Sequence, residues 1–183
     1  EKYTANALGA DLKRFLTDVI KEPAVVSGHS SGGLLAAWLA ANAPESVTGV
    51  ILEDPPFFTT TMPRAMKTWN WIDLASTTHG FLESGQADFI AYNAEHSRLF
   101  TLFGGLQPTL TADILAARAT HPEEPVKIWY MPPVMNEMFR GMSHYDPRFG
   151  DAFYTDRWDD GFDVADALAR ITQPAVLIHT NWS

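Results

Sequence analysis

The sequence contains no cysteine, which excludes a thiol nucleophile, a disulfide framework and a cysteine metal site. Basic residues are few: 13 Lys and Arg stand against 22 Asp and Glu, giving a formal net charge of -9. An acidic surface repels phosphate backbones, so nucleic acid is not expected as a partner. No apolar run approaches the roughly 18 residues of a transmembrane helix, and no signal-peptide pattern opens the chain. We expect no membrane span and a cytoplasmic location.

The two ends of the chain alternate between helical and strand patterns. Amphipathic spacing predicts a helix over residues 4–21, with Thr4 as its N-cap. Residues 34–41 carry no charge and predict a buried helix, and a short helix is expected over residues 163–171. Continuous apolar runs of the kind buried on both faces predict strands over residues 24–27, 47–52 and 175–179. This order predicts an α/β fold class with a parallel sheet and right-handed crossovers.

The character of the chain changes between residues 57 and 163. Continuous apolar strands give way to helical patterns rich in methionine and aromatic residues, punctuated by proline and glycine. Helices are predicted over residues 66–76, 86–102, 112–120 and 134–141. We therefore divide the chain into a core formed by residues 1–56 and 164–183 and an inserted helical unit formed by residues 57–163.

The segment GHSSGG, residues 28–33, separates the first strand from the buried helix. Acyl transfer by serine needs an exposed hydroxyl, a base beside it and amide donors for the developing oxyanion. A tight strand-to-helix turn exposes the hydroxyl, and the residues two before and two after it must then be small. Gly28 and Gly32 meet this condition around Ser30, which is the expected nucleophile.

The neighbouring residues of the turn have separate expected roles. Ser31 is the poorer candidate for the nucleophile, because it would place the bulky His29 at one of the small positions. His29 adjoins Ser30, but adjacent residues of such a turn point away from each other, so we expect it to pack beside the turn rather than to serve as the base. The backbone N–H of Ser31 lies at the helix N-terminus, where negative charge is favoured, and is the expected oxyanion donor. Gly33 leaves room for the helix to pack closely on the sheet.

The GHSSGG segment, between a Val-rich strand and an Ala-rich helix, resembles the nucleophile elbow of the α/β-hydrolase superfamily. VILEDPP, residues 50–56, is similar to the next strand of that family, and QPAVLI, residues 173–178, is similar to the strand that precedes its catalytic acid. The stretch between them stands where many members insert a cap over the active site. The resemblance implies an incomplete parallel-sheet α/β-hydrolase core with an inserted α-helical cap over residues 57–163.

In this superfamily the chain order is nucleophile, acid, histidine. The resemblance therefore implies that the acid and the histidine follow Ser183 and that the second oxyanion donor precedes Glu1, so we expect a central fragment. Asp54, at the end of the strand after the turn, is an alternative acid, because some members take their acid from this position. A loop-capping role for Asp54 is the interpretation we favour. His179 ends the last predicted strand and is a second candidate for lining the site.

The helical unit carries all six methionines and most of the large aromatic residues. These residues form either the unit's own core and docking surface, which we favour, or a hydrophobic substrate pocket. Exposure or a capping hydrogen bond is expected for its histidines, which are His79, His96, His121 and His144. A solvated acidic patch is expected rather than a metal site, because no zinc or calcium ligand spacing appears. Its residues are Asp156, Asp159, Asp160 and Asp163.

Two functions follow. The first is a cofactor-independent hydrolase that acts through Ser30 on an ester, lactone or similar small carbonyl substrate. C–C bond hydrolases and cofactor-free haloperoxidases use the same kind of turn. The alternative is a non-catalytic receptor or scaffold that has kept this fold as a pocket for a small molecule.

A polypeptide of residues 1–183 alone is expected to fold poorly and to be catalytically inactive. Losing the histidine of a serine triad lowers turnover by about a million-fold. Purified residues 1–183 should therefore release no p-nitrophenol from p-nitrophenyl acetate above the buffer rate. Turnover that disappears in the Ser30→Ala variant of the same polypeptide would contradict this expectation.

Overall fold

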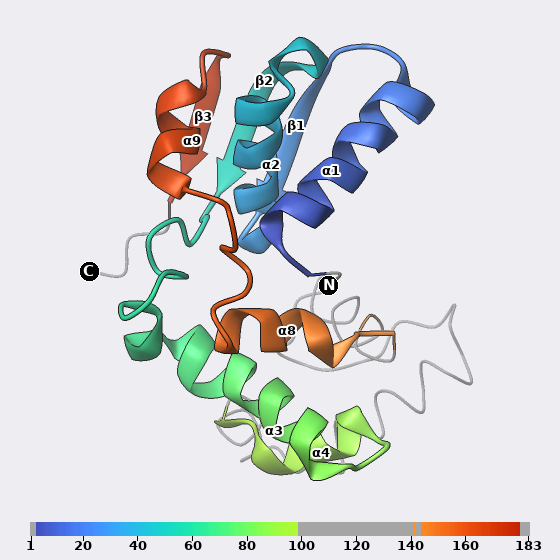
Figure 1. The fold of residues 1–183 in the computed structure, drawn as a ribbon, viewed down its shortest axis with the longest axis vertical. Coiled ribbons are helices and arrows are strands. Elements are labelled where there is room, and N and C mark those ends of the chain that lie inside the picture. The colour runs from blue at the N-terminus through green and yellow to red at the C-terminus, as the bar shows by residue number, and fades with distance from the viewer. Residues whose placement is uncertain (1–2, 99–140, 142–143, 180–183) are drawn as a thin grey trace, which may run out of the picture. The chain divides into compact units, whose positions relative to one another are not determined.

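The computed structural model describes residues 3–98, 141 and 144–179 (Figure 1). The chain forms two compact units, the first made of Glu1–Thr68 and Thr155–Ser183 and the second of Trp69–Tyr154. The sequence placed the divisions instead after residue 56 and after residue 163, and a capping role for the second unit stays a prediction. No described helix combines the length and apolar character that crossing a bilayer requires.

The first unit contains a parallel three-stranded sheet. Its strands, β1 (Ala24–His29), β2 (Val47–Glu53) and β3 (Ala175–Ile178), lie in that order, with β2 paired to both neighbours. The predicted α/β class and parallel sheet are confirmed. The register aligns the last residues of the strands, because His29 pairs with Glu53 and Glu53 with Ile178. The carboxyl ends of all three strands therefore lie at one level.

Three helices accompany this sheet: α1 (Ala5–Phe15), α2 (Ser31–Asn42) and α9 (Val164–Arg170). Helix α2 packs against β1 and β2, with α1 and α9 beside it (Figure 1). Most of its residues are buried, as its lack of charge predicts. A helix that is apolar on all sides belongs in the interior of a domain, and α2 is the element around which the first unit is built.

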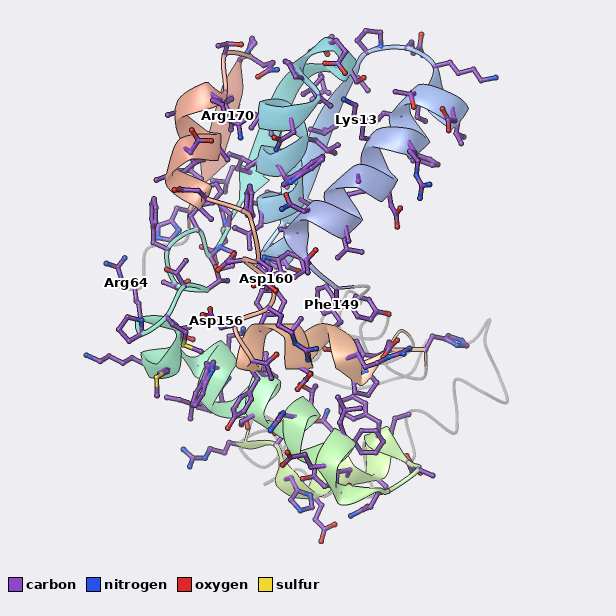
Figure 2. All side chains as sticks on the ribbon, viewed as in Figure 1. Lys13, Arg64, Phe149, Asp156, Asp160 and Arg170 are labelled. Carbon is purple, nitrogen blue, oxygen red and sulfur yellow. The ribbon has the colours of Figure 1, made fainter. Side chains whose placement is uncertain are left out.

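Two cations on the flanking helices bind the last carbonyls of α2 (Figure 2). The Lys13 Nζ lies 3.4 Å from the carbonyl oxygen of Asn42, and the Arg170 Nη1 donates to the carbonyl oxygen of Ala41 at 2.8 Å. The final carbonyls of a helix have no partner within it and carry its negative dipole end. Positive side chains from both neighbours therefore satisfy these groups and fix α1 and α9 to α2.

Helix α1 begins as predicted but docks by a different surface. The Thr4 hydroxyl accepts a hydrogen bond from the Ala7 N–H at 3.1 Å, which confirms the N-cap. The α-helix ends at Phe15 and continues as one π-helical turn, Leu16–Ile20. Its close approach to α2 occurs at Gly9, where an added Cβ would lie 2.7 Å from Cε2 of Trp38. Amphipathic spacing predicts that the large apolar residues of this segment are buried, but four of them are exposed: Leu12, Phe15, Val19 and Ile20.

The expectation that the strands are buried on both faces is wrong for β1 and β3. The Val25 side chain is 62% exposed and alternates with half-buried neighbours, and Leu177 is 61% exposed. In the part of the first unit that the structure describes, the helices α1, α2 and α9 cover one face of the sheet (Figure 1). Alternate residues of β1 are therefore exposed on the other face, and all four residues of β3 are exposed.

The second unit is helical in its described part. It contains a π-helical segment (Asn70–Ala75) that leads into α3 (Ser76–Ser84), followed by α4 (Phe89–His96) and α8 (Pro147–Tyr154). The helix predicted over residues 66–76 is wrong in its limits, because a short 3-10 turn, Ala65–Lys67, stands apart and the helix continues to Ser84. The prediction over residues 86–102 is too long, since α4 is capped by Asp88.

Helix α8 lies outside the helices that the sequence predicts, because it begins with Pro147, and proline was counted among the residues that punctuate this region. Proline is well suited to the first position of a helix, where its missing N–H has no role. The helices predicted over residues 112–120 and 134–141 lie outside the described residues, apart from Gly141. His121 lies there as well.

Aromatic rings and buried polar groups form the described core of the second unit. Phe81 contacts Phe89 and Tyr92 edge to face, with ring centroids 5.1 and 5.6 Å apart. The His79 Nδ1 lies 2.7 Å from Oδ1 of Asp151, so this histidine joins α3 to α8 and is not a simple exposed or capping group. These contacts support the interpretation that the aromatic residues serve the unit's own core.

The prediction that the aspartates before α9 form one solvated patch is wrong. The Asp163 carboxylate caps α9 by accepting from the Asp166 N–H at 3.0 Å. Both carboxylate oxygens of Asp159 are inaccessible to solvent and have no hydrogen-bond partner among the described residues. Asp156 and Asp160, by contrast, are exposed. Within the described residues, no three His, Asp or Glu side chains are grouped as a metal site would require.

Burial raises the pKa of Asp159 to about 6. The nearby Thr60 hydroxyl partly offsets this effect, although the pair does not reach hydrogen-bond geometry, and the charge of Asp156 adds to it. The folded state therefore binds more protons than the unfolded state between about pH 4 and 6. The contribution of Asp159 to the free energy of unfolding is therefore full below the ordinary pKa of aspartate. It is lost as the pH rises through about 6.

Replacing Asp159 by Asn is expected to stabilise the protein at neutral pH. The free energy of unfolding should rise by about 1–2 kcal/mol at pH 7.5 and should not rise at pH 4. The figure is reduced for solvent screening because Asp159 as a whole residue is half-buried, although its carboxylate oxygens are covered. Urea unfolding at both pH values measures the difference. Asp160→Asn, at the exposed neighbouring position, is the matched control and should show no such pH dependence. An equal gain at both pH values for Asp159→Asn would contradict the assignment.

Candidate active site

Ser30 alone forms the turn between β1 and α2. Its backbone has φ 54° and ψ -122°, a conformation that L-residues rarely adopt. The Ser30 N–H donates to the carbonyl oxygen of Glu53 at 2.9 Å, and the Ser30 carbonyl oxygen accepts from the Gly33 N–H at 2.9 Å. The strained residue is thus held to the end of β2 on one side and to the first turn of α2 on the other. The predicted strand-to-helix turn is present.

The space for this turn comes from Gly28. An added Cβ there would clash with the carbonyl group of Gly32 and would lie 2.7 Å from the Gly33 nitrogen. The predicted need for a small residue at Gly28 is therefore confirmed. The same expectation for Gly32 is wrong, because an added Cβ at that position meets nothing within 4 Å. The carbonyl group of Gly32 makes the close contact, and its Cα faces open space.

Gly33 allows α2 to approach the loop after β2. An added Cβ at Gly33 would lie 2.9 Å from Cβ of Pro55 and 3.1 Å from the Gly28 carbonyl oxygen. This agrees with the close packing that the sequence predicts for Gly33. The first turn of α2 therefore packs between the end of β1 and the start of that loop.

The Ser30 side chain is exposed and does not cap α2. Serine at a helix start usually accepts a hydrogen bond from the first turn, but that requires extended backbone angles that Ser30 does not have. The hydroxyl is therefore not consumed by capping, and it stands beside the N-terminal amides of α2, which begins at Ser31. Helix N-termini stabilise developing negative charge. The nucleophilic role of Ser30 and the oxyanion role of Ser31 stay predictions.

Asp54 and His179 come together at the same edge of the sheet. The Asp54 N–H donates to the Ile178 carbonyl oxygen at 2.7 Å, which continues the ladder by one residue. The Asp54 Oδ1 lies 2.8 Å from Nδ1 of His179. Asp54 also has a positive φ, 44°, so the residues that follow β1 and β2 both have a strained backbone. Ser30, Asp54 and His179 therefore occupy equivalent positions after three neighbouring strands.

The sequence identified each of these residues but not the pairing between Asp54 and His179. The signal that could have found it is their common position, one residue beyond strands that lie side by side. Adjacent parallel strands are about 4.8 Å apart, so residues at equal height are neighbours. His29, expected to pack beside the turn, is exposed.

The glycine requirement predicts opposite effects for two nearby substitutions. Gly28→Ala should lower the free energy of unfolding by about 3 kcal/mol or more, because the backbone of Gly32 and Gly33 cannot move aside. Gly32→Ala should be neutral or stabilising by up to about 1 kcal/mol, because alanine restricts the unfolded chain and favours the helix. Chemical denaturation of both variants measures this difference. Equal destabilisation by the two would contradict the packing described here.

Comparison with known proteins gives a consistent result. Residues 1–73 match the family model of the alpha/beta hydrolase fold. The chain is also similar to the crystal structure of a hydrolase from Pseudomonas aeruginosa PA01, with a TM-score of 0.51 and 23% sequence identity. That match covers 98% of this chain but 54% of the solved one, so the chain spans about half the length of this relative. None of the curated proteins matches closely enough to count as a relative.

Proposed function

We propose that the full protein is a serine hydrolase of the α/β-hydrolase superfamily, in which Ser30 attacks a small carbonyl substrate. The match of residues 1–73 to the family model and the fold shared with a solved hydrolase support this proposal. The observation that carries the proposal is the exposed hydroxyl of Ser30 on a strained turn at the N-terminus of α2. Backbone strain of this kind persists where the surrounding structure holds it, and it concentrates at active sites. An ester or lactone is the substrate class that such chemistry serves.

The reaction begins when the Ser30 Oγ forms a bond to the carbonyl carbon of the substrate. The electron pair of the carbonyl π bond moves to the oxygen, and the proton of the hydroxyl passes to a base. The resulting oxyanion is stabilised by the backbone N–H of Ser31 at the start of α2. Collapse of this intermediate expels the alcohol, which takes up the proton. Water then hydrolyses the acylated Ser30 by the same sequence of steps.

The second unit acts as a cap over this site in our proposal. The chain leaves β2 at Glu53, at the same edge of the sheet as Ser30, and returns through α9 to β3. In parallel α/β sheets, ligands bind outside the carboxyl ends of the strands. The second unit is thus inserted in the chain after the strand end that lies beside Ser30, and a role in admitting a small, hydrophobic substrate is part of the proposal.

Ser30→Ala and Ser31→Ala variants of the full-length protein test the proposal. Ser30→Ala should lower turnover of p-nitrophenyl esters by about a million-fold and abolish labelling by a fluorophosphonate probe. Ser31→Ala should keep most of the activity, since its proposed contribution comes from the backbone. Circular dichroism should show both variants folded.

The same experiment separates the alternative functions. Loss of labelling in Ser31→Ala, with labelling kept in Ser30→Ala, would make Ser31 the nucleophile. Wild-type protein that is neither labelled nor active, but is stabilised by small carbonyl compounds in thermal melting, would favour the non-catalytic receptor or scaffold.

A further inference from the structure

Two connections carry the chain from the first unit to the second and back. The outward connection, residues 56–67, follows β2, and the return connection, residues 155–163, precedes α9; both belong to the first unit. Each carries buried polar atoms that have no hydrogen-bond partner among the described residues, namely the hydroxyl oxygen of Thr60 and both carboxylate oxygens of Asp159. Buried polar groups are nearly always paired, so two such groups on neighbouring segments need a structural explanation.

The return connection is anchored on both sides of Asp159. The carbonyl oxygen of Trp158 accepts from the Ala5 N–H at 2.9 Å, and the carbonyl oxygen of Asp160 accepts from Nδ2 of Asn6 at 3.1 Å. The Trp158 side chain is itself buried. The backbone at Asp159 is thereby fixed to the start of α1, so the fold sets the position of this carboxylate without any hydrogen bond to the carboxylate itself.

The outward connection has no such anchor. In the described part of the chain, the hydrogen bonds of residues 56–67 are all made within residues 55–68; for example, the Thr59 N–H donates to the Pro56 carbonyl oxygen at 3.1 Å. A cavity of about 640 Å³ is lined by residues of both connections, among them Phe58 and Thr61 of the outward one. The outward connection is therefore able to move relative to the return connection without breaking hydrogen bonds to the rest of the unit.

The surroundings of Asp159 favour its protonated form. Burial raises its pKa to about 6, the charge of Asp156 adds to the rise, and the Thr60 hydroxyl opposes it. Helix α1 contributes no charged side chain over residues 3–10. Within the described residues, no cation forms an ion pair with Asp159. The other charged side chains of the two connections are Arg64, Lys67, Arg157, Asp160 and Asp163. An ionised Asp159 is consequently a buried charge without a partner, which is costly in free energy.

We propose that Thr60 and Asp159 form a proton-operated clasp between the two connections. With Asp159 protonated, its carboxyl O–H donates to the hydroxyl oxygen of Thr60 and holds the outward connection against the anchored return connection. On ionisation the proton passes to solvent and the donor is lost. The carboxylate then becomes hydrated only when the outward connection moves away. The clasp is closed in mild acid and open at neutral pH, and it does not depend on the proposed reaction of Ser30.

Distances between nitroxide labels in the full-length protein test the clasp. Residues 1–183 contain no cysteine, so Arg64→Cys and Asp160→Cys introduce one labelled position on each connection, with any cysteine elsewhere replaced by serine. Both positions are exposed, and both are marked in Figure 2. Pulsed electron paramagnetic resonance should show the ratio of long to short distances rising by about 5- to 10-fold from pH 5 to pH 7.5. Labels at Thr48→Cys and Asp160→Cys, both outside the outward connection, form the reference pair and should keep one distance.

Variants of the two clasp residues, made in the labelled protein, assign the effect to them. Asp159→Asn should keep the short distance at both pH values, because its amide N–H donates to Thr60 and does not titrate. Thr60→Val keeps the shape of the side chain but removes the acceptor, and should raise the ratio of long to short distances by about 5-fold at pH 5. Thr60→Ser keeps the hydroxyl and is the matched control, which should behave as wild type.

Four results would overturn the clasp. They are distances that do not change with pH in the wild type, a pH dependence that persists in Asp159→Asn, equal distances in Thr60→Val and Thr60→Ser, and a change in the reference pair that matches the change between the connections. The last result would mean that the whole first unit loosens and that no local release occurs. None of the four bears on the proposal for Ser30, which depends on activity and labelling.

Discussion

The close approach of Gly28 to the carbonyl group of Gly32 is the contact on which the rest of the candidate site depends. A side chain at residue 28 would occupy the place of that carbonyl, so the chain could not turn from β1 into α2 within one residue. Because it does turn there, Ser30 takes a strained conformation and its hydroxyl is left outside the helix. The same turn directs the first amides of α2 toward the carboxyl edge of the sheet. The absence of a side chain at Gly28 thus permits both the exposed hydroxyl and the helix dipole beside it.

Most of the helices and strands of the first unit were predictable, because short stretches of sequence determine them. Uncharged residues over 34–41 indicated a buried helix, and Thr4 indicated the start of α1. The burial of the strands was not predictable in this way. An apolar run such as that of β3 shows that both faces of the strand could be buried. Whether they are buried depends on which other elements pack against the strand. Proline at residue 147 was misleading for a related reason, since the same residue ends one helix and begins another.

The residues of the candidate site differ in the same way, because some were predictable from local sequence and others were not. Ser30 was found because the small residues around it are neighbours in the sequence. The pairing of Asp54 with His179 depends on the register of two strands that are separated by the whole second unit, and no local pattern encodes it. The burial of Asp159 was missed for the same reason, because it arises from packing near Thr60, which is far away in sequence. Composition showed an acidic cluster there, and only the fold distinguishes its buried member from the exposed ones.

The arrangement of Ser30, Asp54 and His179 at the ends of three strands has an evolutionary consequence. Each residue belongs to a separate strand, and its height is set by backbone hydrogen bonds that do not depend on its side chain. A substitution at any one of these ends would alter the chemistry while leaving the supporting ladder intact. Residues placed in this way at a strand edge can change one at a time without any change of the scaffold.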